Sequence, residues 1–461
     1  MKSLGTTSLA LRNLDKSKAA FFASALIAAF AYGFASGKFR IFPYGILAES
    51  GRAAIDVWGH WRSYVGSSPT RWLKPARVAG AGVTIRAEGL YQDGLTLVSS
   101  LFDGDVGIRL IRPDGTTFHA WRIRYLDIWN KRELAALQLK PLANWDVGVM
   151  GVHLFPDASV VFTFNDGGLV KLDKCGHIVW KRTYLTHHSI ASSEDGTLWV
   201  PSAKPPVTAG HAAGVAPLVQ PFIEDTVLQL DLNGNALREI SVAKLLLKNG
   251  LEGLLLANGV TATVNLTDDF THLNKVAVLQ SADAGSFPLF RAGDVLVSLR
   301  NLDLIFVFDP DSQLIKWYQV GPWLRQHDPQ FTHDGRISVF DNHSDNADGR
   351  LFGGSRIVRV DPNTRAVQVV YAGSREAPFY TDIEGEHSYL PNGNLLISES
   401  MAGRIFEVDP RGRIVWEFVN RYDKAHIVAE TNAYGRFASN YLQSVDWSCG
   451  GKSGQESGDG A

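Results

Sequence analysis

Three histidines that open similar segments of the chain are its best candidates for chemistry. His188 and His327 each lie eight residues before the glycine of an Asp-Gly turn, and His387 lies six residues before the matching Gly393. Side chains on one face of a β-strand recur at every second residue, so this spacing predicts that the three histidines share a face. Imidazole changes charge near neutral pH and can form covalent intermediates, which suits a nucleophile and its acid/base partners.

Other histidines are expected to have lesser roles. His187 adjoins His188 and should face away from it, and His153 has the opposite parity relative to its own turn, which favours a structural role. His272 and Asn274 open a further segment, and we expect them to add polar lining to the same site. No HxH or HExxH spacing occurs in the sequence, so neither a metal site nor a bound cofactor is expected.

Cationic donors for an anionic substrate are the next requirement. A guanidinium can hold a tetrahedral oxyanion through paired hydrogen bonds. Polar residues are dense at 341–356, where Arg350, Arg356 and Asn342 are the candidates for substrate binding. A structural role for Arg356 is equally open, because Arg404 occupies the equivalent place in the next repeat.

The elements that must position these side chains are short repeated strands. Six related segments recur between residues 89 and 420, each with glycine-centred turns, apolar runs and a last run often ending in Trp. A period of roughly 40–50 residues built in this way predicts an all-β, six-bladed β-propeller whose inner strands line a central channel. The run 79–87 is the candidate strand for closing the ring. Four tryptophans are expected to pack between blades, namely Trp121, Trp180, Trp317 and Trp416.

Charge and cysteine content exclude some classes of protein. The 45 Lys and Arg residues nearly balance 47 Asp and Glu residues, so bulk electrostatics predict no nucleic-acid binding. The only two cysteines, Cys175 and Cys449, cannot form a disulfide framework and are interpreted as incidental.

An uncharged stretch near the N-terminus predicts a membrane anchor. The run AAFFASALIAAFAYGFASG at 19–37 is long enough, as a helix, to cross a bilayer core of about 30 Å. Lys2, Arg12, Lys16 and Lys18 precede it, so the positive-inside rule places the N-terminus in the cytoplasm and the remainder outside. A cleaved signal peptide is the main alternative, because small residues follow Phe34.

The chain therefore divides into five predicted parts. They are a cytoplasmic N-terminus at 1–17, a transmembrane signal anchor at 18–37, a juxtamembrane segment at 38–78, the propeller at 79–425, and a C-terminal extension at 426–461 with a disordered tail from about 448.

Several phrases together resemble the arylsulfotransferase-like family of bacterial six-bladed propellers. The resemblance covers roughly residues 88–420 and is carried by HHSIASSEDGTLWV, HLNKVAVL, QHDPQFTHDGRISVFDN, SRIVRVD, GEHSYLPNGNLLISES and RIFEVDPRGRIVWEF. Family members move a sulfuryl group from an aryl sulfate to a phenol through a sulfated histidine, without a nucleotide donor. The resemblance thus implies an oxyanion-binding channel with histidines at its axis.

Residue by residue, the resemblance assigns roles to several of the same positions. His188 resembles the family histidine that opens an early blade, and His327 resembles the one in the His-Asp phrase. Asn342 resembles the Asn of the Phe-Asp-Asn turn, and Arg350 or Arg356 the arginine that follows. The family nucleophile follows the Gly-rich stretch of the last blade, where this chain has SESMAG, and His387 lies in the preceding strand instead.

These observations lead to two functional hypotheses. The first is a periplasmic arylsulfotransferase anchored in the bacterial inner membrane by one helix, with His387 or His327 as nucleophile and His188 as acid/base partner. Its partners would be an aryl sulfate and a phenolic or other hydroxyl acceptor. The second is a non-catalytic propeller that binds an anionic envelope glycan or a protein through the same channel mouth.

Overall fold

The computed structural model describes residues 16–39, 68–137, 139, 141–207, 222–255 and 269–449, in two units, Met1–Tyr64 and Val65–Ala461. In the first unit the predicted anchor at 18–37 falls on helix α1 (Lys16–Phe39). Of the described helices, none has the combination of length and apolar character that a membrane crossing requires. The predicted N-terminal residues 1–15, the segment 40–67 and the tail 450–461 lie outside the described residues.

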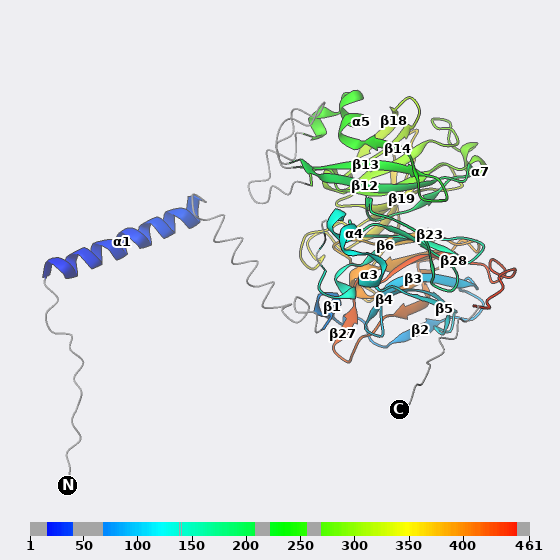
Figure 1. The fold of residues 1–461 in the computed structure, drawn as a ribbon, viewed down its shortest axis with the longest axis horizontal. Coiled ribbons are helices and arrows are strands. Elements are labelled where there is room, and N and C mark those ends of the chain that lie inside the picture. Colours follow the sequence, from blue (N-terminus) through cyan, green and yellow to red (C-terminus); the bar gives the residue numbers. More distant parts are fainter. Residues whose placement is uncertain are drawn as a thin grey trace, which may run out of the picture. The chain divides into compact units, whose positions relative to one another are not determined.

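The second unit is the six-bladed propeller that the repeats predict (Figure 1). Its first three blades, in the spatial order of their strands, are β28 (Asn432–Phe437), β3 (Leu95–Phe102), β4 (Asp105–Ile111) and β5 (Thr117–Arg122); β6 (Val149–Leu154), β7 (Val160–Phe164), β8 (Leu169–Leu172) and β9 (Ile178–Arg182); and β10 (Leu185–Thr186) with β11 (Ala191–Ser192), β12 (Leu198–Val207), β13 (Phe222–Leu230) and β14 (Ala236–Ser241).

The other three blades follow in chain order. They are β15 (Leu273–Val278), β16 (Val295–Leu299), β17 (Leu304–Asp309) and β18 (Leu314–Val320); β19 (His327–Phe331), β20 (Ile337–Asp341), β21 (Arg356–Val360) and β22 (Val367–Ala372); and β23 (Glu386–Tyr389), β24 (Leu395–Glu399), β25 (Arg404–Val408), β26 (Ile414–Val419) and β2 (Gly82–Arg86). Strands β1 (Leu73–Pro75) and β27 (His426–Val428) form a separate pair.

Short helices occupy the connections between strands. They are α3 (Tyr125–Ile128), α4 (Lys131–Ala136), α5 (Val242–Lys248), α7 (Ser281–Ala284) and the 3-10 turns η1 (Thr70–Trp72), η2 (Asn144–Asp146), η3 (Arg300–Leu302) and η4 (Ser400–Ala402).

The glycine-centred turns form the tight hairpins expected from the sequence. Gly335, in the turn between β19 and β20, has a φ of +76°, and a Cβ there would lie 2.3 Å from the carbonyl oxygen of Ser286. Only glycine fits both the left-handed backbone and the close neighbouring chain. The second strand of that blade, β20, is buried along its whole length, so the apolar run after the turn forms the core of the blade.

Both ends of the chain close the ring. The predicted closing strand at 79–87 pairs through β2 with β26, at the outer edge of the sixth blade. In addition, β28 pairs with β3 and forms the innermost strand of the first blade (Figure 1). The propeller therefore extends beyond residue 425 into the segment predicted to be a C-terminal extension, and the pairing covers sheet edges that would otherwise be exposed.

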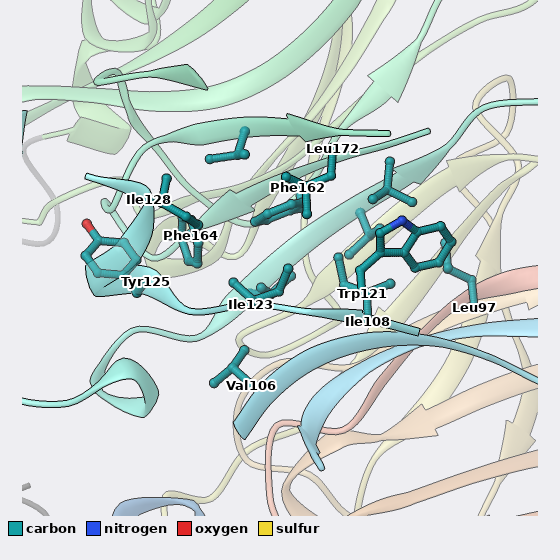
Figure 2. Close-up of a cluster of buried hydrophobic side chains, with 14 of the residues drawn as sticks. Leu97, Val106, Ile108, Trp121, Ile123, Tyr125, Ile128, Phe162, Phe164 and Leu172 are labelled. Carbon is teal, nitrogen blue, oxygen red and sulfur yellow. The ribbon is translucent and has the colours of Figure 1, made fainter. Parts of the chain in front are cut away.

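The tryptophans pack between blades as the repeats predict. Figure 2 shows the cluster between the first two blades, where Trp121 and Ile108 lie near Phe162 and Leu172. The indole nitrogen of Trp121 donates to Asp173 O at 2.9 Å, in a turn of the next blade. Trp180 and Trp416 make the equivalent bond to Leu232 O and Pro113 O. Each ring thus fills a wedge between blades and also ties them together.

The two cysteines were interpreted as incidental, and this is wrong, because they form a disulfide. The Cα atoms of Cys175 and Cys449 lie 5.7 Å apart. Lys174 Nζ also donates to the backbone oxygen of Ser448 at 2.7 Å. The segment after β28 is thereby fastened to the hairpin between β8 and β9, 274 residues away in sequence. A count of two cysteines excluded a framework of several bridges but did not exclude one long-range bridge.

Candidate functional site

The candidate site lies at the end of the propeller where inner strands begin and second strands end, and this end is called the mouth. The pairing of His327 with Phe340 shows this arrangement in the fifth blade, since it joins the first residue of β19 to β20 near its last residue, Asp341. Residues that precede an inner strand and residues that follow a second strand therefore meet at this mouth. Loops at one end of a repeated scaffold are the usual place for binding and catalysis.

A left-handed residue recurs just before the inner strand in five of the six blades. The residues, with their φ angles, are His188 (54°), His272 (50°), Arg325 (58°), Glu384 (57°) and Glu430 (55°). This conformation is uncommon for residues other than glycine, and clusters of it mark functional sites. The third to fifth blades contribute imidazoles and a guanidinium, whereas the sixth and first contribute carboxyl groups.

Three imidazoles lie close together on the side of the mouth formed by the third, fourth and fifth blades. The ring centroids of His188 and His272 lie 5.2 Å apart, and those of His188 and His327 lie 6.4 Å apart. The sequence predicts that His188 and His327 share a face, and the structure brings their rings close together. The third member is His272, which was expected only to line the site, and not His387.

The tautomer of His327 is set by its neighbours. Asn342 Nδ2 donates to the carbonyl oxygens of Thr381 and Glu384, at 3.0 and 2.6 Å, so its Oδ1 must face His327 Nδ1 at 2.7 Å. The carbonyl oxygen of Arg325 lies 3.1 Å from the same nitrogen. Two acceptors require a proton on Nδ1, which leaves the lone pair of the neutral ring on Nε2. Asn342, predicted to bind substrate, instead orients the histidine.

His272 and His188 are also held through Nδ1. His272 Nδ1 lies 2.5 Å from Asp269 Oδ2, and the backbone N–H of His272 donates to the other carboxylate oxygen. His188 Nδ1 lies 2.9 Å from His187 Nδ1, so His187 contacts His188 and does not face away as predicted. The parity argument failed here because His188 has left-handed backbone outside a regular strand. All three rings thus keep Nε2 available to a substrate.

Arg300 supplies the positive charge of the site. It lies in η3, between β16 and β17, and its backbone N–H donates to His272 O at 3.0 Å. Burial and the nearby Arg325 lower the pKa of Arg300 to about 10, so it stays cationic at neutral pH. In the described part of the chain it has no carboxylate in ion-pair contact, and its buried Nε has no hydrogen-bond partner. Such a guanidinium is suited to an anionic ligand.

Two of the three imidazoles, His327 and His188, are neutral in this environment. Burial and the charge of Arg300 lower the pKa of His327 to about 3. Burial and His187, with smaller contributions from His272 and His327, hold the pKa of His188 well below its usual value. Both rings therefore present lone pairs at neutral pH, as a nucleophile must.

Carboxyl groups form the other side of the mouth. Burial and the nearby Glu430 raise the pKa of Glu384 to about 8, and burial also raises the pKa of Glu430. Asn432 Nδ2 donates to Glu384 Oε2 at 3.0 Å. The mouth is therefore divided between a cationic side and a carboxyl side, on which Glu384 favours its protonated form at neutral pH.

His387 lies apart from the cluster, contrary to the prediction from parity. Its ring is buried between the fifth and sixth blades, with Nε2 2.6 Å from Ser338 Oγ and Nδ1 2.9 Å from Asp328 Oδ2. The latter contact does not meet the geometry of a hydrogen bond. The prediction failed because one extra residue bulges between His327 and Gln330, which shifts the parity of β19 relative to its turn.

The predicted arginines do not reach the imidazoles. The side chain of Arg350 is 87 % exposed and pairs with Asp348. Arg356 Nε binds Asp341 Oδ2 at 2.7 Å, and Arg404 binds Glu399 at the equivalent position of the sixth blade. The ion pair with Asp341 is consistent with the structural alternative for Arg356.

Asn274 and His153 also have defined surroundings. Asn274 is buried and donates from Nδ2 to Gln326 O at 2.7 Å, beside the strand that carries His327. His153 packs against Phe155, with the centroids 4.6 Å apart. Across the described residues no set of three or more acidic, histidine or cysteine side chains is placed to hold a metal ion.

Sequence reasoning missed Arg300, Asp269 and His187. Asp269 lies three residues before His272, a spacing that allows a local carboxylate–imidazole contact, so this pair had a readable signal. Arg300 follows an ordinary second strand and had none.

The model of the family described as Arylsulfotransferase (ASST) matches residues 151–421, more than half of the chain. The chain belongs to this arylsulfotransferase family. The matched region includes all three clustered histidines and Arg300, whereas the four strands of the first blade lie outside it. No curated protein sequence matches this arylsulfotransferase-family chain significantly.

Solved structures similar to this arylsulfotransferase-family chain are distant. A Bacteroides caccae protein of unknown function is 12 % identical, covers 70 % of this chain and 93 % of its own, and has a TM-score of 0.43. Virginiamycin B lyase from Staphylococcus aureus is 13 % identical, covers 59 % and 70 %, and has a TM-score of 0.33. Neither carries information about the activity of this chain.

Proposed function

We propose that this protein transfers a sulfuryl group from an aryl sulfate to a phenolic or other hydroxyl acceptor through a histidine. The observation that carries the proposal is the group of three imidazoles, each held through Nδ1, beside the half-buried cation Arg300. Membership of the arylsulfotransferase family supports the same chemistry.

His327 is the proposed nucleophile. Its neutral Nε2 attacks the sulfur while the bond from sulfur to the aryl oxygen breaks, and the aryloxide takes a proton from cationic His272. The acceptor hydroxyl then returns a proton to His272 as its oxygen attacks sulfur, and the nitrogen–sulfur bond breaks to restore neutral His327. Asp269 Oδ2, 2.5 Å from His272 Nδ1, orients the ring so that its Nε2 can make this exchange.

Arg300 and His188 complete the proposed site. The Arg300 guanidinium would bind sulfuryl oxygens, on which negative charge is retained throughout the transfer, and fixed donors of this kind commonly contribute most to such catalysis. His188 lies between the other two rings and shares a proton with His187, which positions it beside the transferred group.

The test is turnover of a nitrophenyl sulfate with a phenol as acceptor. Wild-type protein should release nitrophenol and form the new aryl sulfate, whereas His327→Ala, His272→Ala and Arg300→Met should not. His153→Gln is the matched control, because His153 is half-buried like His188 and His272 but lies against Phe155 away from the cluster. If no donor is turned over, or if His327→Ala equals wild type, the non-catalytic glycan- or protein-binding hypothesis replaces this one.

We further propose that the propeller is exported and remains attached to the inner membrane. The uncharged run at 19–37, with basic residues before it, supports this location. The Cys175–Cys449 disulfide also supports it, because such bonds persist in oxidising compartments. Protease added to spheroplasts should degrade the propeller, and alkaline carbonate should leave it in the membrane fraction. Protection from protease or release by carbonate would contradict the location.

A further inference from the structure

We propose that Asp328 is a positioning residue which, held by Lys275 of the fourth blade and His387 of the sixth, sets the backbone bulge that presents His327 to the channel mouth. The inference rests on the proposed role of His327. It also gives His387, which the sequence suggested as a nucleophile, a different task.

Strand β19 contains a backbone bulge near its start. His327 pairs with Phe340, whereas Gln330 pairs with Ser338, so β19 contains one residue more than β20 across this interval. Asp328 has a φ of +49° and precedes Pro329, and a residue before proline is normally extended. A bulge redirects neighbouring side chains, but this backbone needs surrounding contacts to hold it.

The Asp328 carboxylate makes those contacts with two neighbouring blades. Its Oδ2 accepts from the backbone N–H of His387 at 2.7 Å and lies 2.9 Å from His387 Nδ1. Its Oδ1 forms an ion pair with Lys275 Nζ. Gln330 Nε2 donates to Asp328 Oδ2 at 2.6 Å and also to the carbonyl oxygen of His387, which closes the group.

Charge keeps the group in one state at neutral pH. Burial opposes ionisation of Asp328, but Lys275 and His387 outweigh it and hold the pKa of Asp328 below its ordinary value. Burial and Asp328 raise the pKa of Glu386, which lies 3.3 Å from Lys275 Nζ, well above the usual range. Lys275 and Asp328 are thus an ion pair, with Glu386 beside it. Removing one charge would leave the other buried and unpaired.

The consequence for His327 follows from covalent connection. His327 directly precedes Asp328, and its ring must stay within 2.7 Å of Asn342 Oδ1 to keep the proton on Nδ1. If Asp328 leaves the left-handed conformation, this hydrogen bond and the tautomer that it fixes are lost. The contacts of Asp328 with Lys275, Gln330 and His387, called the clamp, would therefore act on the nucleophile without contacting the substrate.

The test compares two Lys–Asp ion pairs in the same protein, in each of which the carboxylate is fully buried. Lys275→Met breaks the clamp, and Lys316→Met breaks the control pair with Asp294, in which both carboxylate oxygens lie 2.7 Å from Nζ. Nitrogen-15 NMR of histidine-labelled full-length protein reports the tautomer of His327 without any substrate. Both variants should unfold at lower temperature, but only Lys275→Met should lose the pure Nδ1–H signature of His327.

Activity provides a second readout. Lys275→Met should lower kcat by at least about ten-fold with little change in KM, because misplacement of a reacting group slows chemistry more than binding. Asp328→Asn, which tolerates the left-handed backbone and keeps an acceptor, should retain more activity than Asp328→Ala. If Lys275→Met does not fold, the comparison of Asp328→Asn with Asp328→Ala replaces it as the test.

An unchanged His327 spectrum in the clamp variants, or equal effects of Lys275→Met and Lys316→Met, would overturn the inference. A different result would contradict the proposed function alone. In that case wild-type protein would turn over no aryl sulfate, although the clamp variants would still change the His327 spectrum.

Discussion

The imidazole rings of His188 and His272 meet edge to face, with their centroids 5.2 Å apart and their planes at 78°. The two rings come from adjacent blades, and each is held through its Nδ1 by a different partner. His187 contacts His188, and Asp269 contacts His272. Contact between rings that are fixed independently indicates a preorganised site, because neither ring has to reorient when a ligand arrives.

The cation of the site gives the first prediction. Arg300→Met should lower kcat by about 100- to 1,000-fold, the range expected when one donor to a developing charge is lost. Arg300→Lys should recover only part of the loss, because an ammonium lacks the planar fork of donors. Steady-state kinetics measure both, and the exposed Arg350→Met is the control. Equal rates for Arg300→Met and wild type would remove Arg300 from the site.

The low pKa of His327 predicts how the site responds to acid. Burial and Arg300 lower this pKa to about 3, so the ring should remain neutral in an NMR titration down to about pH 5. The contribution of the neutral His327 ring to the free energy of unfolding is fully present above the unfolded pKa of about 6.5. It decreases as the pH falls from there towards 3. A midpoint near 6.5 for His327 would contradict the described burial.

The raised pKa of Glu384 predicts a stability change of opposite sign. Its carboxyl favours the protonated form, with a pKa of about 8, so its contribution is fully present below the unfolded pKa and is lost as pH rises through about 8. At pH 8.5 the free energy of unfolding of Glu384→Gln should therefore exceed that of wild type by at least about 1 kcal/mol, since one pKa unit corresponds to about 1.4 kcal/mol. The variant should accordingly melt at a higher temperature. The difference should vanish near pH 4.5. A difference that is constant with pH would indicate another cause.

The disulfide gives a prediction about stability alone. Reduction, or Cys175→Ser with Cys449→Ser, should lower the free energy of unfolding by about 2–4 kcal/mol, because the bridge closes a very long loop. Chemical denaturation with and without a reductant measures this. The double variant should show no further effect of reductant, and an unchanged midpoint for reduced wild type would exclude a stabilising role.

The fold could be predicted from the sequence because its signal is repeated. Glycine turns such as that at Gly335 and final tryptophans such as Trp121 recur in register, and each copy reinforces the same strand pattern. The site was only partly predictable. His188 and His327 were found from their place at the head of a segment, but parity arguments require regular strands, and the bulge at Asp328 breaks that regularity.

Roles set by partners distant in sequence could not be inferred from one chain. Arg356 has the sequence surroundings of a substrate-binding arginine, yet Asp341 across the hairpin binds it. His387 has the spacing of a channel residue, yet Asp328 and Ser338 from the neighbouring blade enclose it. Arg300 reaches the histidines only because the ring of blades brings η3 to the mouth.

The most direct test of the account is a search for a sulfated histidine by mass spectrometry, after brief exposure of the protein to an aryl sulfate without acceptor. The account predicts one sulfuryl adduct, on His327, that disappears when a phenol is added and is absent from His327→Ala. An adduct on His387, or complete turnover with no histidine adduct under any quench, would contradict it.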